Sequence, residues 1–122
     1  MTAVRIAPLL IIVGIGACTK HVTKVPVVAG GSAERGAIAI KRYGCAACHT
    51  IPGIETAQGM VGPPLNGVAQ RVYIAGVLPN QPENLVKWIM DPPAVDPKTA
   101  MPMLGISERD ARDMAEYLYT RQ

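Results

Sequence analysis

Apolar residues recur at helical spacing in three stretches of this chain, and each stretch starts with a residue that favours a helix start. Ser32 precedes the stretch 33–43, Pro82 opens the stretch 82–90, and Ser107 begins a Ser-x-x-Asp sequence that resembles a capping box. The predicted inward faces are Gly36, Ala37, Ile40 and Tyr43, then Leu85, Trp88 and Ile89, and finally Ala111, Met114, Ala115 and Leu118 with Tyr117 beside them. Pro92-Pro93 is expected to end the second helix. The pattern therefore predicts three helices joined by loops.

The segments between these helices contain much of the Gly and Pro, of which the chain has 12 and 11, and none shows a strand pattern. A chain of 122 residues allows one domain, and only 4% of its residues are aromatic. So few large side chains fill a core poorly, and we therefore expect something else to supply apolar bulk or a covalent link. The net charge is +3 and the 12 Lys and Arg are scattered, which argues against nucleic acid as a partner. The predicted fold class is all-α.

The first 18 residues have the features of an export signal. Arg5 precedes an apolar stretch of 12 residues, 6–17, whereas a membrane-spanning helix needs about 20. The sequence Ile15-Gly16-Ala17-Cys18 resembles a bacterial lipobox, which implies cleavage before Cys18 and attachment of lipid to it. An ordinary signal peptide with an incidental Cys, or an uncleaved anchor, is the alternative.

The lipobox interpretation divides the chain into three parts. Residues 1–17 are the expected signal peptide, 18–31 a lipid-anchored linker that ends in Gly-Gly, and 32–122 the folded domain. Several acyl chains hold a protein on a membrane more firmly than one chain does. We therefore expect a lipid-anchored protein on the periplasmic side of a bacterial membrane.

Cys45-Ala46-Ala47-Cys48-His49 is the most specific motif in the chain. Cys-x-x-Cys-His is the attachment sequence of c-type haem, and residues three and four apart share one helical face. Two thiols can then bond one porphyrin while the imidazole binds its iron. A thioredoxin-like pair would need a βαβ context, a zinc site would need a fourth ligand such as His21, and a disulfide between cysteines so close in sequence is unfavourable.

Together these motifs make residues 32–122 resemble a class I cytochrome c, above all the small bacterial members and the cytochrome c domains associated with cytochrome oxidases. The resemblance implies three to five helices around one haem c, bound covalently through Cys45 and Cys48. Gly62-Pro63-Pro64-Leu65-Asn66-Gly67 resembles the family loop whose Pro carbonyl, here that of Pro63, accepts a hydrogen bond from the haem-ligating histidine, His49. The alternative for this loop is a plain turn.

The resemblance also implies which side chains surround the haem. Met101 matches the register of the distal ligand, four residues before a Gly, with Met103 as the alternative. Arg71 lies where the family often places an Arg near a haem propionate, and Tyr73 and Trp88 are further candidates for contact with the haem.

The function that follows is a membrane-tethered, single-haem electron carrier rather than an enzyme. The expected partners are a bc-type complex or a periplasmic dehydrogenase as donor and a terminal oxidase as acceptor, with the protein a monomer or a subunit of a complex. One alternative is a haem c subunit bound tightly to one periplasmic oxidoreductase or oxidase. Another is a haem-based gas sensor or peroxidase, although the sequence shows no distal acid–base residues.

Overall fold

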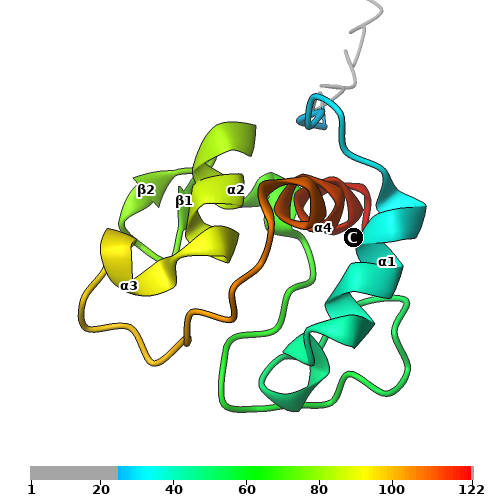
Figure 1. Ribbon diagram of the computed structural model, residues 1–122, viewed down its shortest axis with the longest axis horizontal. Coiled ribbons are helices and arrows are strands. Elements are labelled where there is room, and N and C mark those ends of the chain that lie inside the picture. Colours follow the sequence, from blue (N-terminus) through cyan, green and yellow to red (C-terminus); the bar gives the residue numbers. More distant parts are fainter. Residues whose placement is uncertain (1–24, 122) are drawn as a thin grey trace, which may run out of the picture.

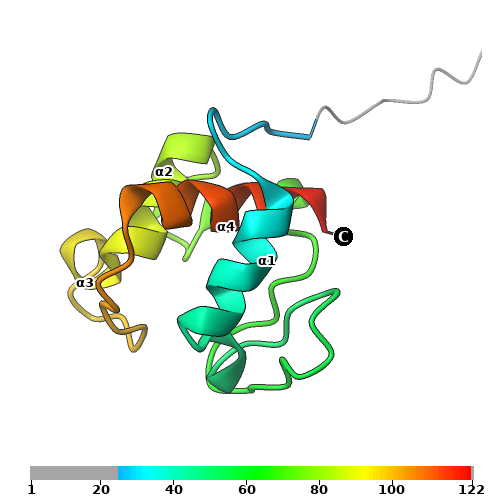
Figure 2. The ribbon, with the colours of Figure 1, turned by 45° about the vertical axis from the view of Figure 1, so that its right-hand side comes forward.

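Residues 25–121 of the chain are described by a computed structural model (Figure 1). This part contains α1 (Ala33–Arg42), α2 (Pro82–Met90), α3 (Pro92–Val95) and α4 (Glu108–Thr120), the short 3-10 helices η1 (Cys45–Ala47) and η2 (Val68–Gln70), and strands β1 (Tyr73–Ile74) and β2 (Leu78–Pro79). Helices α1 and α4 cross each other, and α2 packs against α4 (Figures 1 and 2). The expected signal peptide, 1–17, and Cys18 lie outside the described residues.

The helices begin at the positions that the capping residues in the sequence indicate. The Ser32 hydroxyl accepts a hydrogen bond from the Arg35 N–H at 3.4 Å, and the Ser107 hydroxyl accepts one from the Asp110 N–H at 3.2 Å. Pro82 occupies the first turn of α2, where its missing N–H costs nothing. Three long helices and the all-α class are therefore confirmed, whereas the two features that follow were not expected.

The prediction that Pro92-Pro93 only ends a helix was incomplete. Helix α2 does end at Met90, but Pro92 then opens α3, a single turn of helix. The Asp91 side chain caps this turn by accepting a hydrogen bond from the Ala94 N–H at 3.1 Å. Proline is unfavourable inside a helix but favourable in its first turn. The same dipeptide therefore prevents α2 from continuing and begins α3.

The expectation of no strands is corrected by one small antiparallel sheet. Ile74 pairs with Leu78 and Tyr73 with Pro79, across a turn in which Ala75 and Gly76 both have positive φ. Strands of two residues leave no room for the alternating pattern by which strands are recognised in a sequence.

Gly36, on the predicted inward face of α1, lies where α1 and α4 approach each other closely. A Cβ atom at this position would lie 2.0 Å from the Asp113 carbonyl oxygen and 2.9 Å from the Tyr117 Cβ, so only glycine permits this approach. Beside the crossing, the Arg35 guanidinium forms two hydrogen bonds with the buried Asp113 carboxylate, at 2.6 and 2.7 Å. The Arg35 hydrogen bond is the main reason that the pKa of Asp113 lies below its usual value.

The end of the expected linker is part of the folded structure. Val28 is buried in the core, and its N–H donates to the Glu116 carboxylate at 2.8 Å. The Ser32 N–H donates to the Asp113 carboxylate, also at 2.8 Å. These contacts with α4 place the start of the folded unit a few residues before the boundary expected at residue 32.

The core lies between α4 and the elements around it. Its buried side chains include the predicted α4 stripe and also Tyr119, Val86 and Asp113, which the apolar pattern did not predict. Trp88 is half-buried and lines the cavity, so its predicted inward position is confirmed, and Val86 is a further buried residue of α2. Among residues 25–121, no helix has both the length and the apolar character needed to cross a membrane.

Candidate haem-binding site

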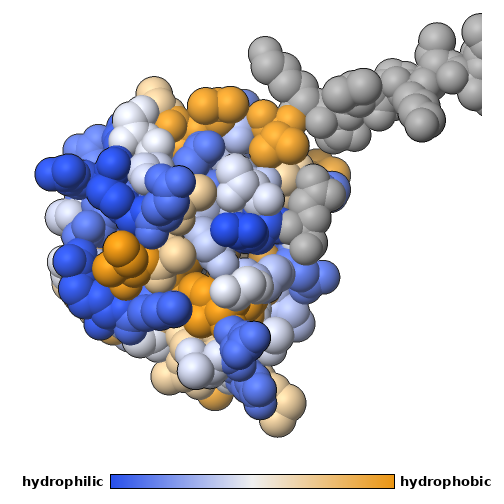
Figure 3. Space-filling view, turned by 90° about the vertical axis from the view of Figure 1, so that its right-hand side faces the viewer, coloured by the Kyte–Doolittle hydropathy of each residue, from blue (hydrophilic) through white to orange (hydrophobic). Residues whose placement is uncertain are grey.

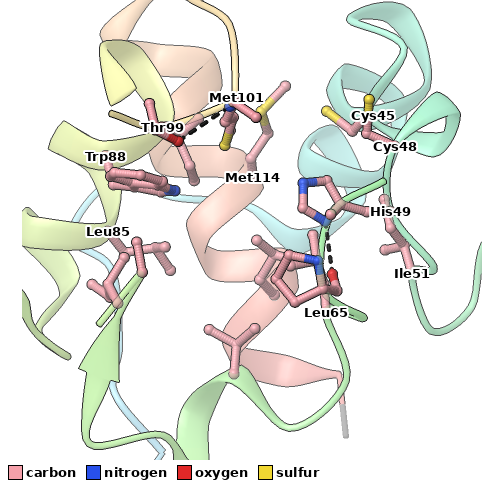
Figure 4. Close-up of a pocket in the computed structure, with 18 of the residues that line it drawn as sticks. Cys45, Cys48, His49, Ile51, Leu65, Leu85, Trp88, Thr99, Met101 and Met114 are labelled. Atoms are coloured by element: carbon pink, nitrogen blue, oxygen red, sulfur yellow. Dashed lines mark hydrogen bonds between the residues drawn. The ribbon is translucent and has the colours of Figure 1, made fainter. Parts of the chain in front are cut away.

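The Cys-x-x-Cys-His sequence folds as a tight turn after α1. Gly44, with φ of 72°, ends that helix, and η1 follows directly. The backbone N–H groups of Cys48 and His49 both donate to the Cys45 carbonyl, at 3.2 and 3.0 Å. This turn presents the two thiols and the imidazole on the same side of a cavity, and Cys45 and Cys48 are not joined to each other (Figure 4). Burial raises the pKa of the Cys45 thiol.

The His49 imidazole is oriented by Pro63, as the resemblance implied. With its proton on Nδ1, the ring donates to the Pro63 carbonyl oxygen at 2.7 Å. The lone pair of Nε2 is then available on the cavity side (Figure 4). The ring is 9% exposed. A hydrogen bond of this kind selects the tautomer and the orientation of a metal-ligating histidine.

Gly62 leaves space for the ring. A Cβ atom there would lie 2.3 Å from the His49 Cε1 atom and 2.7 Å from Nδ1. The Gly62 N–H donates to the Cys48 carbonyl at 2.8 Å, and the Leu65 N–H donates to the Thr50 carbonyl at the same distance. The loop that carries Pro63 is therefore held against the Cys-x-x-Cys-His turn, and it is more than the plain turn that was its alternative.

The cavity beside His49 has a volume of about 550 Å³ and mainly apolar walls. His49, Cys45 and Cys48 lie on one side of it, and Met101, Thr99 and Trp88 lie on the other (Figure 4). Further apolar side chains of its walls are Ile40, Ile51, Leu65, Val68, Ile74, Leu85, Ile89, Met114 and Leu118. Its size is in the range of cofactor sites, and its walls suit a large apolar group.

The two methionines considered as distal ligand differ in position. Met101 is partly buried and lines the cavity, with its N–H bonded to the Thr99 hydroxyl at 3.1 Å. Met103 is 61% exposed and is not among the lining residues. Met114 also lines the cavity, but it lies in the buried stripe of α4. The geometry therefore favours Met101 over Met103.

The three remaining candidates all line the cavity, in different ways. Arg71 lies with its guanidinium on the Pro64 and Asn66 carbonyl oxygens, at 3.1 Å from the latter. Tyr73 is 56% exposed at the edge of the hairpin, and Trp88 is half-buried on α2.

Asn80 is a residue of this site that the sequence analysis missed. Its side-chain amide donates to the Val68 carbonyl at 2.7 Å and to the Arg71 carbonyl at 2.8 Å, and its oxygen accepts from the Tyr119 hydroxyl at 2.8 Å. Asn80 thus joins the cavity loop to α4. Burial raises the pKa of Tyr119 to about 12. The only sequence signal was an Asn after a Pro, which indicates a turn and nothing more specific.

These residues fit a haem. The cavity is apolar, two thiols lie at its edge, an imidazole nitrogen faces it, and a thioether lies on the other side. In residues 25–121, no three His, Cys, Asp or Glu side chains gather in a way that could hold a metal ion, and the sheet of this part is antiparallel rather than βαβ. The fold and the site together define a small c-type haem domain.

Comparison with known proteins gives the family. The family model described as "Cytochrome c" matches residues 33–122, and the chain belongs to the cytochrome c family. The chain is 34% identical over 87 residues to cytochrome c oxidase subunit 2 of Alkalihalophilus pseudofirmus, an alignment that covers 70% of this chain and 25% of that protein. It is 38% identical over 80 residues to cytochrome c oxidase subunit 2 of a Bacillus species, covering 64% of this chain and 22% of that protein.

The chain thus spans about a quarter of the length of these relatives. Cytochrome c2 from Rhodobacter sphaeroides has the same fold, with a TM-score of 0.56 at 22% identity, over 75% of this chain and 96% of that one. The recognition of a class I cytochrome c is confirmed, and with it one haem c, bound covalently at the Cys45-x-x-Cys48-His49 sequence.

Proposed function

We propose that this protein carries single electrons, and that His49 and Met101 are the two residues that would bind its haem iron. The family consists of electron carriers. The observation that supports this assignment most directly is that Met101, and not Met103, lines the cavity across from His49 (Figure 4). When bound, haem supplies a one-electron couple between ferric and ferrous iron.

The residues of the chain prepare the site for fast electron exchange. Pro63 makes His49 a better ligand by accepting its Nδ1 proton, and a thioether ligand on the other side raises the reduction potential relative to a second imidazole. Met101 in that position leaves no place for a substrate, which opposes the gas sensor and the peroxidase. The apolar walls keep water away, so little rearrangement accompanies a change of charge.

Three further side chains have supporting roles in this proposal. Trp88 on α2 would pack against the cofactor, and Arg71 in the loop and Tyr73 in the hairpin would bind its propionates. All three line the cavity. In the structure the Arg71 guanidinium donates to loop carbonyl oxygens, including that of Asn66. To contact a propionate it would leave these carbonyls for the carboxylate, because a charge-assisted hydrogen bond is stronger.

We also propose that the protein is anchored through Cys18 on the periplasmic side of a bacterial membrane. The lipobox-like sequence supports the anchor, and Val28 supports a short tether because the chain is already packed on α4 there. Cys18 precedes Val25 by seven residues, and an extended chain covers at most about 3.5 Å per residue. The domain therefore stays within about 25 Å of the lipid, close to membrane-bound partners.

A terminal oxidase is the proposed acceptor, with a bc-type complex or a periplasmic dehydrogenase as donor. The support is that both relatives are named cytochrome c oxidase subunit 2. The same names favour a second candidate, a haem subunit bound tightly to one oxidase. Co-purification of the chain with an oxidase in fixed ratio would select this candidate, and recovery of the chain alone from membranes would select the mobile carrier.

The axial ligands are tested by optical spectra of the purified haem protein and two variants. The wild type and Met103→Ala should show a low-spin ferrous spectrum, the weak far-red ferric band of iron–thioether bonding and no change with carbon monoxide. Met101→Ala should lose the far-red band and bind carbon monoxide. The opposite pattern would assign Met103, and a wild-type spectrum that shifts with carbon monoxide would refute the carrier and favour the sensor or peroxidase.

A further inference from the structure

The loops on either side of the haem cavity carry large apolar side chains in water. Met60 is 92% exposed and Val61 77%, while Met103 is 61% exposed and Leu104 42%. Val61 and Leu104 both line the cavity, so the two pairs meet at the same cavity from different loops. Both loops lie in the lower half of the ribbon in Figures 1 and 2. We call these four residues the apolar collar.

Charge is sparse along the two loops of this collar, although Arg71 and Asp96 also line the cavity. Residues 56–70 and 99–107 contain no Lys, Arg, Asp or Glu, and the nearest charges along the two loops are Glu55, Arg71, Lys98 and Glu108. Charged residues are instead frequent on α1 and α4, where several pair with each other, as in Arg42–Asp110 and Arg112–Glu108. Figure 3 shows the side of the molecule near α1, over much of which hydrophilic residues predominate.

The collar is not needed for the core. Its exposed methionines contribute little to folding, and exposed apolar pairs on two loops that border one cavity are unusual for a surface without a partner. Methionine is flexible and polarisable, and it is enriched at protein interfaces, whose centres are poor in charge.

From these observations we infer that the apolar collar is the docking surface for the redox partner, and that the partner presents an uncharged apolar face to it. This inference rests on the proposed electron-carrier function. A charged partner face would lose its hydration against the collar without meeting an opposite charge, which is unfavourable. Upon docking, one electron would pass from the reduced haem, which would be oxidised to the ferric form, to a metal centre of the acceptor, and no proton would be transferred.

The experiment uses the reduced protein and respiratory membranes that contain a terminal oxidase. The second-order rate at which the membranes oxidise the protein is followed by absorbance as the salt concentration rises from about 10 to about 150 mM. This change shortens the Debye length from about 30 to about 8 Å. We expect a change of less than about twofold, because the two loops of the collar bring no charge to the interface. We expect Met60→Lys and Met103→Lys to lower the rate at least about fivefold, because a lysine would be desolvated at the interface centre.

Ile38→Lys is the matched control. Ile38 is 65% exposed on α1 and does not line the cavity, so the same added charge should leave the rate within about twofold. A small cobalt complex needs no docking surface, so its rate of oxidation of the haem should be equal in the wild type and the three lysine variants. The far-red ferric band should persist in all four proteins. These two measurements test the haem site, and so the proposed function, independently of the collar.

Several results would overturn the inference. A wild-type rate that falls tenfold with salt would indicate charged docking, and unchanged rates in both methionine variants would remove the collar from the interface. A dimer in solution that Met60→Lys dissociates would assign the surface to a second copy of this chain. Flotation of the Cys18→Ser protein with phospholipid vesicles, abolished by Met60→Lys, would assign it to lipid. A wild type oxidised by the cobalt complex but not by the membranes would refute the oxidase as acceptor, and with it this docking partner.

Discussion

The substitution Gly36→Ala tests the crossing of α1 and α4, because local and tertiary effects predict opposite signs. Gly36 lies inside α1, where alanine is favoured over glycine by about 1 kcal/mol through helix propensity. In the fold, however, the new Cβ would lie 2.0 Å from the Asp113 carbonyl oxygen and 2.6 Å from its carbon, both backbone atoms of α4. Backbone atoms cannot turn aside as a side chain can, so the helices themselves must separate.

Ordinary contact at a Cβ begins near 3.4 Å, so a separation of roughly 1 Å or more is needed. That movement would loosen the packing of Ile40 and Tyr117 and stretch the hydrogen bonds of Arg35 to Asp113. Overpacking typically costs about 1–3 kcal/mol, and this contact is severe, so the cost should exceed the gain in propensity. We expect Gly36→Ala to lower the free energy of unfolding by about 2 kcal/mol.

The assay is denaturant unfolding of the haem protein, with the free energy extrapolated to water at unchanged m-value. The local term is measured separately at Ile38, which is exposed on the same helix: Ile38→Ala should be about 1 kcal/mol more stable than Ile38→Gly. A Gly36→Ala protein as stable as the wild type, or more stable, would show that helix propensity decides at this position and that the close crossing does not.

Two other substitutions probe the site and its support. Gly62→Ala should lower haem incorporation and weaken the far-red ferric band, because the new Cβ would lie 2.3 Å from the His49 ring; full haem content with a normal spectrum would contradict this. Asp113→Asn should cost about 1–3 kcal/mol at neutral pH, since it weakens the hydrogen bonds to Arg35. Arg35 lowers the pKa of Asp113 in the fold, so its contribution is complete above the unfolded pKa near 4 and is lost as pH falls through the lower folded pKa. Wild type and variant should therefore become more similar in unfolding free energy at pH 3 or below, and an undiminished difference there would refute the assignment.

Much of the site could be predicted because its residues follow one another closely in sequence. Cys45, Cys48 and His49 share one turn, and local hydrogen bonds to the Cys45 carbonyl are sufficient to bring them together. The helix starts at Ser32 and Ser107 were predictable for the same reason, since capping depends on a residue and its near neighbours.

The features that were missed depend on groups far apart in sequence. Asn80 joins the cavity loop to α4 through a hydrogen bond with Tyr119, which is 39 residues away, and no sequence pattern near either residue predicts that bond. Asp113 is polar yet buried, because its carboxylate accepts hydrogen bonds from Arg35 and from the Ser32 N–H, which lie 78 and 81 residues away in sequence. Val28 belongs to the fold rather than to the linker because Glu116 accepts its N–H.

The sequence by itself determined the class of this protein: three capped helices, one haem attachment turn, and a loop in which Pro63 follows that turn at the family spacing. Short-range geometry is enough for each of these, because a turn or a helix end is complete within a few residues. Only the tertiary structure decided that Met101 rather than Met103 lines the cavity, and that exposed apolar residues from two separate loops meet at the same cavity. The register four residues before a Gly already favoured Met101, but which of two methionines separated by one residue faces inward depends on how the whole chain closes around the cavity.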